Sequence, residues 1–345
     1  MCAPLVPCPF PVPGPNRAGT LHAVLTPAST PRPRTTEELL GPELVARLDR
    51  LEVLSRKVFA GKLPGERRSR RKGSSVEFDD YRNYVPGDDL RRIDWNVFAR
   101  MDRFFVKLFR EEEDQALHIA IDASASMDAG SPGKLVLAQR LAMALAYIGL
   151  VNQSRVIVSV LGARGRPAFQ QLAPMRGRRN AVRVARFILD NVWPPEGAAD
   201  RPAAAAGFND LLRTLALTRR GKGVLILISD FLVREDLKPG LNYLTGGGFD
   251  VHCLQVLSPG ELEPEKEGGG SVIGDLRLTD VETGAAAEVT VTAATIKQYK
   301  RRLEAYIESV RSACAARGIG HSLVRSDADL GGLITGCLRR KRLVG

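Results

Sequence analysis

Cysteine, histidine and tryptophan are scarce in this sequence of 345 residues, which holds five, four and two of them. The cysteines are odd in number and contain no Cys-x-x-Cys pair: Cys2, Cys8, Cys253, Cys314 and Cys337. The four histidines, at positions 22, 118, 252 and 321, show no metal-ligand spacing. These features argue against a disulfide framework and against a zinc site.

Long apolar runs are also missing. No run of about 18 uncharged apolar residues occurs, so we expect no integral membrane span. The N-terminal stretch "MCAPLVPCPFPVPGPNRAG" is broken by prolines and lacks a basic start, which argues against a signal peptide. Hydrophobic content of 44% and charged content of 26% are ordinary globular values. The expectation is a cytoplasmic protein with one large or two modest domains.

Several common enzyme signatures are absent from the chain. It contains no GxxxxGK[ST] loop for nucleotide phosphates and no GxSxG nucleophile elbow. Its glycine loops at 246–248 and 268–270 do not link a strand to a helix as dinucleotide-binding loops do. We therefore expect no catalytic residues and a protein that is not an enzyme.

The net charge of +11 is concentrated in three places. Residues 1–36 hold three arginines and no acid, and "ERRSRRK" (66–72) and "RRKR" (339–342) supply the rest. Separate clusters with few interleaved aromatics do not make the continuous basic face that nucleic acid requires. We expect no nucleic-acid partner, although binding through these basic arms stays open as an alternative function.

The chain divides into three segments by composition. Residues 1–36 are proline-rich and without period, and we expect a disordered extension. Residues 37–113 form a family-specific N-terminal region that opens with a helix over 35–61, whose apolar stripe is Leu44, Leu48, Leu51 and Leu54. Residues 114–345 form the main domain.

Apolar strands alternate with amphipathic helices along the main domain. Strands are predicted at 117–123, 155–163, 223–231, 249–257 and 321–326, with helices at 133–153, 180–193, 209–220 and 295–318 between them. This alternation predicts an α/β fold with a doubly wound, mostly parallel sheet flanked by helices. A hairpin insertion is expected at 265–292, turning at Glu282–Gly284.

The stretch "LHIAIDASASMDAG" (117–130) ends its strand in one carboxylate and two hydroxyls. Ligands of doubly wound sheets bind at the carboxyl ends of the strands. Asp122, Ser124 and Ser126 would lie at that edge, and Asp230 ends "VLILISD" in a second central strand, pointing its carboxylate to the same place. Such oxygen groups suit a hard divalent cation that keeps some waters. The alternative is that the aspartates and serines cap turns by bonding main-chain amides.

This constellation resembles the metal ion-dependent adhesion site of von Willebrand factor A-like domains. The resemblance implies that Mg²⁺ (or Mn²⁺) is held by Asp122, Ser124 and Ser126, with Asp230 as the distal ligand. It also implies that one position is left for an acidic side chain of a partner. The family's threonine element appears here as Gly207-Phe208-Asn209-Asp210, so Asn209 takes the place of the threonine.

A second block lies upstream, in "EFDDYRNYVPGDDLRRIDWNVFAR" (77–100). It resembles the signature of the bacterial family called domain of unknown function 58, which is von Willebrand factor A-like. The matching residues are Glu77, Phe78, Arg82, Tyr84, Pro86, Gly87, Asp88, Arg92, Ile93, Asp94, Trp95, Ala99 and Arg100. We interpret the charged members Arg82, Asp88, Arg92, Asp94 and Arg100 as a structural ion-pair network.

The family resemblance implies partnership with a MoxR-type AAA+ ATPase. In that picture the protein is a non-catalytic, Mg²⁺-dependent adaptor that recognises a protein client through an acidic residue. A metal-assisted phosphoesterase is the enzyme alternative, with Arg176, Arg178 and Arg179 as a phosphate clamp.

Overall fold

The computed structural model describes most of the chain, which forms two compact units: Lys57–Asp114, and Met1–Arg56 together with Gln115–Gly345. The described residues are 31–53, 77–86, 88, 90, 93–110, 116–195, 206–218, 223–246, 249–265, 274–279, 286–340 and 343. The predicted extension at 1–36 and the basic arms lie mostly outside them.

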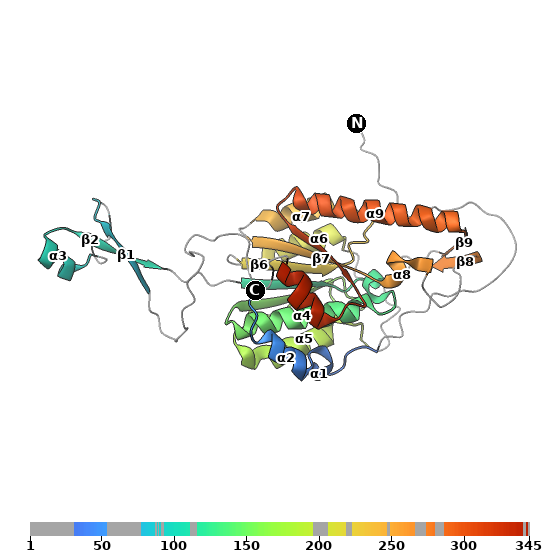
Figure 1. The fold of residues 1–345 in the computed structure, drawn as a ribbon, viewed down its shortest axis with the longest axis horizontal. Helices are drawn as coiled ribbons and strands as arrows, with labels where there is room; N and C mark the ends of the chain where they lie inside the picture. The colour runs from blue at the N-terminus through green and yellow to red at the C-terminus, as the bar shows by residue number, and fades with distance from the viewer. Residues whose placement is uncertain are drawn as a thin grey trace, which may run out of the picture. The chain divides into compact units, whose positions relative to one another are not determined.

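A six-stranded sheet forms the centre of the larger unit, in the order β10-β7-β6-β3-β4-β5 (Figure 1). Its strands are β3 (Ala116–Asp122), β4 (Arg155–Leu161), β5 (Phe169–Gln171), β6 (Gly223–Ser229), β7 (Phe249–Leu257) and β10 (Gly320–Arg325). All neighbours are parallel except β4 and β5. The predicted doubly wound α/β fold is therefore confirmed, and its arrangement is consistent with a von Willebrand factor A-like domain.

The central strands β3, β6 and β7 are buried along their whole length. Strands covered on both faces are built from nearly continuous apolar runs, which explains why no alternation is visible in them. The chain order reverses between β3 and β6, because β4 and β5 follow β3 on one side and β7 and β10 follow β6 on the other. This switch point is where doubly wound sheets place their ligands.

Helices cover both faces of the sheet (Figure 1). Those packed into the larger apolar core include α4 (Lys134–Val151) and α5 (Ala181–Val192), and those on the other face are α6 (Phe208–Thr218), α7 (Leu237–Thr245) and α9 (Ala293–Ala315). Among the described helices, α4 alone is long and apolar enough to cross a membrane, but 83% of it is buried inside the fold. Its apolarity is accounted for by the core.

The predicted helix over 35–61 is described only up to residue 53, and within that part it is two short helices instead, α1 (Thr36–Leu39) and α2 (Pro42–Leu48). Gly41 and Pro42 separate them, since proline has no amide hydrogen to continue a helix and is favoured at its first position. Leu39, Leu40, Leu48 and Leu51 are buried in the core beside α4 and α5. The segment with α1 and α2 therefore packs as part of the larger unit, although the sequence analysis grouped it with the N-terminal region 37–113.

The smaller unit contains β1 (Glu77–Asn83), α3 (Trp95–Met101) and β2 (Phe105–Arg110). Strand β2 pairs with β1, antiparallel, in a two-stranded sheet that is separate from the six-stranded one. Of the expected ion-pair network, Arg82 bonds Asp88 at 2.8 Å, while Asp94 caps α3 and accepts the Tyr81 hydroxyl. Arg92 lies outside the described residues, and Arg100 is in the last turn of α3.

The predicted hairpin insertion is present. Strands β8 (Gly274–Thr279) and β9 (Ala286–Val291) pair antiparallel in a third sheet, and their turn lies outside the described residues. A short helix, α8 (Pro259–Leu262), precedes this hairpin directly after β7. The chain then ends in α10 (Leu330–Gly332) and η6 (Leu333–Leu338), which contribute Leu330, Ile334 and Leu338 to the core.

Candidate functional site

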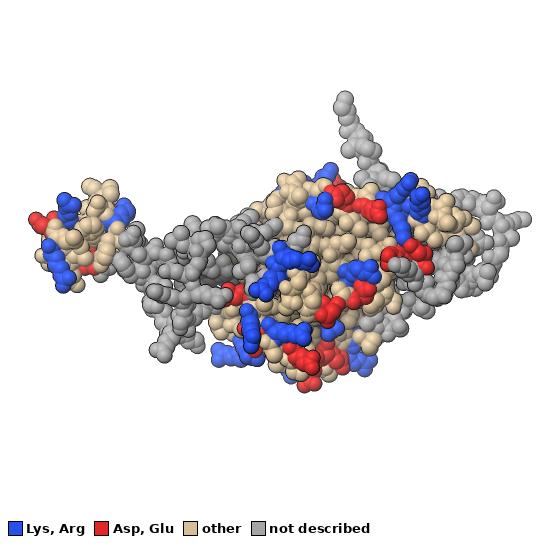
Figure 2. Space-filling view, in the orientation of Figure 1, with Lys and Arg blue, Asp and Glu red and all other residues tan. Residues whose placement is uncertain are grey.

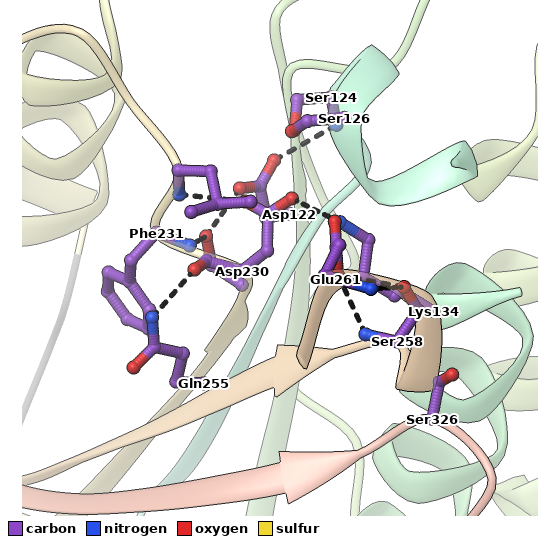
Figure 3. Close-up of polar contacts among 12 residues, drawn as sticks. Asp122, Ser124, Ser126, Lys134, Asp230, Phe231, Gln255, Ser258, Glu261 and Ser326 are labelled. Carbon is purple, nitrogen blue, oxygen red and sulfur yellow. Dashed lines mark hydrogen bonds and ion pairs between the residues drawn. The ribbon is translucent and has the colours of Figure 1, made fainter. Parts of the chain in front are cut away.

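The carboxyl ends of β3 and β6 lie side by side at the switch point of the sheet. Their parallel register runs from Ala116 opposite Gly223 to Ile121 opposite Ile228, so the next residues, Asp122 and Ser229, are neighbours. We call the group formed by Asp122, Ser124, Ser126, Ser229 and Asp230 the rim site. Figure 3 labels Asp122, Ser124, Ser126 and Asp230. Two chain segments separated by about a hundred residues thus meet there because the sheet fixes their register.

Asp122 and the two serines form one cluster. The Ser124 main-chain amide donates to Asp122 Oδ1 at 2.9 Å, as the capping alternative requires. The Oγ atoms of Ser124 and Ser126 lie 3.0 Å apart and bond to each other, with no side-chain cap at Ser124. Asp122 is 2% exposed, whereas both serines are partly exposed. The carboxylate is therefore presented from inside the protein, and the hydroxyls from its surface.

Ser229 is a member of the rim site that the sequence patterns did not single out. Its hydroxyl donates to Asp122 Oδ2 at 2.6 Å and accepts the main-chain amide of Phe231 at 2.9 Å. A serine that ends a wholly apolar strand, just before an aspartate, was the available signal. Its bond to Asp122 fixes the orientation of that carboxylate.

Asp230 follows β6 in an unusual backbone setting. The next residue, Phe231, is fully buried and has φ of +57°, a left-handed conformation rare for a bulky side chain. The strain is held in place by hydrogen bonds around it, since the Phe231 carbonyl accepts from Tyr306 and the Asp230 carbonyl accepts from Gln255. Strained backbone conformations that the surrounding structure holds in place occur most often at functional sites, where they orient a side chain.

Lys134 is the first residue of α4, and its side chain contacts Asp230. Its Nζ lies 2.8 Å from Asp230 Oδ2 and 2.5 Å from Glu261 Oε1. Burial alone would lower the pKa of Lys134, but the two carboxylates outweigh it and raise that pKa above its ordinary value, so the ammonium is charged. Neither Lys134 nor Glu261 was predicted; the signals were a lysine opening an apolar helix and the capping-box sequence Ser258-Pro-Gly-Glu261.

Burial and the charge of Asp230 together raise the pKa of Asp122 from 3.8 to about 6. Hydrogen bonds from Ser229 and from Ser124 act in the opposite direction but do not cancel these causes. The hydrogen bonds therefore do not fully stabilise the ionised, buried carboxylate of Asp122. A cation placed against Asp122 would supply the missing stabilisation.

Asn209, predicted as a ligand in place of the threonine, is bound to a neighbouring helix. Its Oδ1 accepts the Gly240 amide at 2.9 Å, and its Nδ2 donates to the Asp236 carbonyl at 2.9 Å. Both ends of the amide thus join the start of α6 to the start of α7. The structure brings together four of the five predicted ligands, and it gives Asn209 a separate set of partners.

We expect Asn209→Ala to lower stability without weakening metal binding. The partly buried Gly240 amide of α7 would lose its partner, which costs about 1–3 kcal/mol of the free energy of unfolding, whereas the exposed Asp236 carbonyl can bond water instead. Urea denaturation in EDTA measures that loss, and Mg²⁺ titration by calorimetry measures the affinity. A fall in Mg²⁺ affinity as large as that caused by Asp122→Ala would instead make Asn209 a ligand.

Arg178, one of the three arginines expected as a phosphate clamp, lies away from the rim site. Arg178 lies over the ring of Tyr147 and pairs with Asp49 at 3.4 Å. Tyr147 is 13 residues beyond Lys134 in α4, which corresponds to about 20 Å along the helix axis. On the face of the larger unit drawn in Figure 2, basic and acidic side chains are interspersed.

The comparisons with known proteins identify the family. The model for "Protein of unknown function DUF58" matches residues 80–308. The chain belongs to this family. Uncharacterized proteins of Mycobacterium tuberculosis (Rv1480) and Mycobacterium bovis (Mb1516) are each 29% identical to it over 293 residues, which cover 84% of this chain and 86% of theirs. The family assignment predicted from the 77–100 block is therefore confirmed.

Among solved structures, this member of the DUF58 family is similar to the pilus adhesin SpaC from Lactobacillus rhamnosus GG. The two share 11% identity with a TM-score of 0.36, and the match covers 67% of this chain and 31% of the adhesin. A likeness of that size carries no argument about function.

The donor set of the rim site fits a hard divalent cation. Mg²⁺ held in an octahedron at 2.0–2.1 Å places neighbouring ligand oxygens about 3 Å apart, and the Ser124 and Ser126 hydroxyls are 3.0 Å apart. With its neighbours Lys134 and Glu261 included, the rim site has three carboxylates (Asp122, Asp230 and Glu261) and one ammonium, which leave two negative charges when all are ionised, and a dication balances them. Among the described residues no group of three His, Cys, Asp or Glu side chains is arranged around one point, so hydroxyls are essential to this set.

Proposed function

We propose that this DUF58 protein is a non-catalytic, Mg²⁺-dependent protein-interaction module that acts in the cytoplasm. The observation that carries the proposal is the rim site itself. A buried, orientated carboxylate from Asp122 meets two partly exposed, adjacent hydroxyls from Ser124 and Ser126 at the switch point of the sheet. The donor types, their spacing and the excess negative charge all favour a hard cation at the protein surface.

The protein's own residues would hold and orient the ion. Asp122 supplies the charge, fixed by the Ser229 hydroxyl, and Ser124 and Ser126 supply neutral oxygens on the solvent side. Asp230 adds negative charge from behind. When bound, the ion would offer an open position that takes a carboxylate oxygen from another protein.

The partners follow from the same chemistry and from the family resemblance. An acidic side chain of a client protein fits a cation whose remaining positions face solvent. A MoxR-type AAA+ ATPase is the second partner that the resemblance implies, with this chain as its adaptor. In this proposal the adaptor recognises the client protein, and the ATPase supplies the energy for its assembly or remodelling.

Replacing both Ser124 and Ser126 by alanine tests the proposal. We expect capture of the purified ATPase by the wild-type protein in Mg²⁺ and not in EDTA, and a loss of about tenfold to a hundredfold in that affinity for the double variant, because two ligand oxygens are gone. Ser309→Ala, on the exposed face of α9, is the matched control and should bind normally. Equal binding by all proteins with or without Mg²⁺ would contradict the proposal, and Mg²⁺-dependent hydrolysis of a phosphomonoester by the wild-type protein would favour an enzyme instead.

A further inference from the structure

Lys134 is the most completely buried charged group beside the rim site. Its side chain is 0% exposed, and Asp230 is 1% exposed. A lone buried ammonium or carboxylate is strongly unfavourable, so each of the two requires the other. The pair joins α4 to the end of β6, across 96 residues of sequence.

The carboxylate of Asp230 is occupied on both sides. Its Oδ2 accepts from the Lys134 ammonium at 2.8 Å, and its Oδ1 accepts the Leu232 main-chain amide at 3.0 Å. For Asp230 to ligate a dication directly, it would have to share its charge between that ion and the ammonium. The two cations would then stand within a few ångströms of each other in a buried place, where their repulsion is weakly screened.

Glu261 completes the arrangement. Its Oε1 contacts Lys134, and its Oε2 accepts both the amide and the hydroxyl of Ser258 in the capping box of α8. Lys134 is thereby fixed between the end of β6 and the turn that follows β7 (Figure 3). An ammonium with two fixed carboxylates on different elements cannot move away when a metal ion arrives.

We propose that Lys134 is a resident cation of the rim site, with Asp230 as its counter-ion, and that Asp230 is a positioning residue and not a metal ligand. The statement that Asp230 is not a metal ligand rests on the proposed function, whereas the pairing of Lys134 with Asp230 does not. The ion would be held from the Asp122 side alone, by one carboxylate and two hydroxyls. More of its positions are then left to water and to the oxygens of an acidic partner, which makes binding of metal and partner mutually reinforcing.

A double-mutant cycle in EDTA tests the pairing. Lys134→Met leaves two carboxylates without their cation, Asp230→Asn leaves the ammonium with Glu261 alone, and the double variant removes both charges. We expect each single variant to lower the melting temperature, by about 5–10 °C for Lys134→Met, and the double variant to recover at least half of that loss. Lys300→Met, which breaks the partly exposed ion pair with Glu265, is the matched control and should change little.

Mg²⁺ titration of the same variants tests the role of Asp230. The double variant keeps the net charge of the site, so we expect its Mg²⁺ affinity to stay within about tenfold of wild type, whereas Asp122→Ala should lose about a hundredfold or more. A loss by the double variant as large as that of Asp122→Ala would make Asp230 a ligand and overturn the inference.

The two failures are distinguishable. If the wild-type protein binds no Mg²⁺, the proposed function fails, and the thermal cycle alone decides whether Lys134 is the resident cation. Additive losses of melting temperature in that cycle would overturn the pairing, and a coupled recovery would support it. If the wild-type protein binds Mg²⁺ and the double variant does not, the proposed function stands and the inference fails.

Discussion

Asp122→Asn should stabilise the metal-free protein while it abolishes Mg²⁺ binding. The native Asp122 carboxylate is buried beside Asp230, and its pKa is raised from 3.8 to about 6. The folded protein therefore binds a proton more tightly than the unfolded chain does, and stability is lost as pH rises from about 4 to about 6. Above that window the charged form costs roughly 3 kcal/mol, which a neutral asparagine of the same shape would not incur.

With Mg²⁺ present the order of stability should reverse. The wild-type protein gains about 2.7 kcal/mol when the ion is at a hundred times its dissociation constant, and the variant, without its charged ligand, gains nothing. Urea denaturation at pH 4, 5, 6 and 7.5, with EDTA or Mg²⁺, measures both effects in one series.

Asp190→Asn, at an exposed position of α5, is the charge-matched control for this series. It should follow the wild-type protein in EDTA and in Mg²⁺ at every pH. A variant Asp122→Asn that is less stable than wild type in EDTA at pH 7.5 would show that the carboxylate is not destabilising in the folded state. It would then be held by its hydrogen bonds alone, and the argument for a missing cation would fail.

The sequence predicted the fold well because the fold depends on long, strongly patterned segments. Apolar strands that alternate with helices along the main domain leave little choice but a mostly parallel sheet covered on both faces. The edge of the sheet that carries Asp122 and Asp230 follows from this topology, without knowledge of any side-chain contact. Patterning also placed the late hairpin, β8–β9, in an insertion of its own.

The partners within the rim site could not be predicted in the same way. Lys134 is remote in sequence from Asp230 and Glu261, and whether its long side chain points outward or inward depends on packing around it. A lysine in the first turn of a helix is ordinarily solvated, since burying it without a counter-ion is costly. Only the packing of α4 against α8 and the end of β6 shows that the Lys134 ammonium contacts two carboxylates.

The assignment of Asn209 illustrates the opposite error that motif reasoning invites. The position of a residue in a motif indicates where it lies on a helix, but it does not determine which groups its side chain bonds. Here two main-chain groups of α7 lie within reach of the amide, and they engage both of its ends. Local competition of this kind leaves no mark in a sequence, because the competing groups belong to the backbone.

Gly223→Ala should destabilise the protein more than any exposed substitution, by about 3 kcal/mol or more. A Cβ at Gly223 would overlap the main-chain carbonyl of Ala116, with the carbonyl carbon 2.7 Å away and the amide nitrogen 2.8 Å away. Neither is the end of a flexible side chain, so β3 and β6 themselves would have to separate. Urea denaturation of the variant measures the cost.

Gly246→Ala is the control, because a Cβ there meets nothing within 4 Å and the backbone φ of −67° suits alanine. Its stability should stay within about 1 kcal/mol of wild type. If Gly223→Ala proved equally harmless, the pairing of Gly223 with Ala116 would be wrong. The same ladder, six residues further along, is what sets Ser229 beside Asp122, so a slip at its start would separate the two residues that orient the proposed metal ligand.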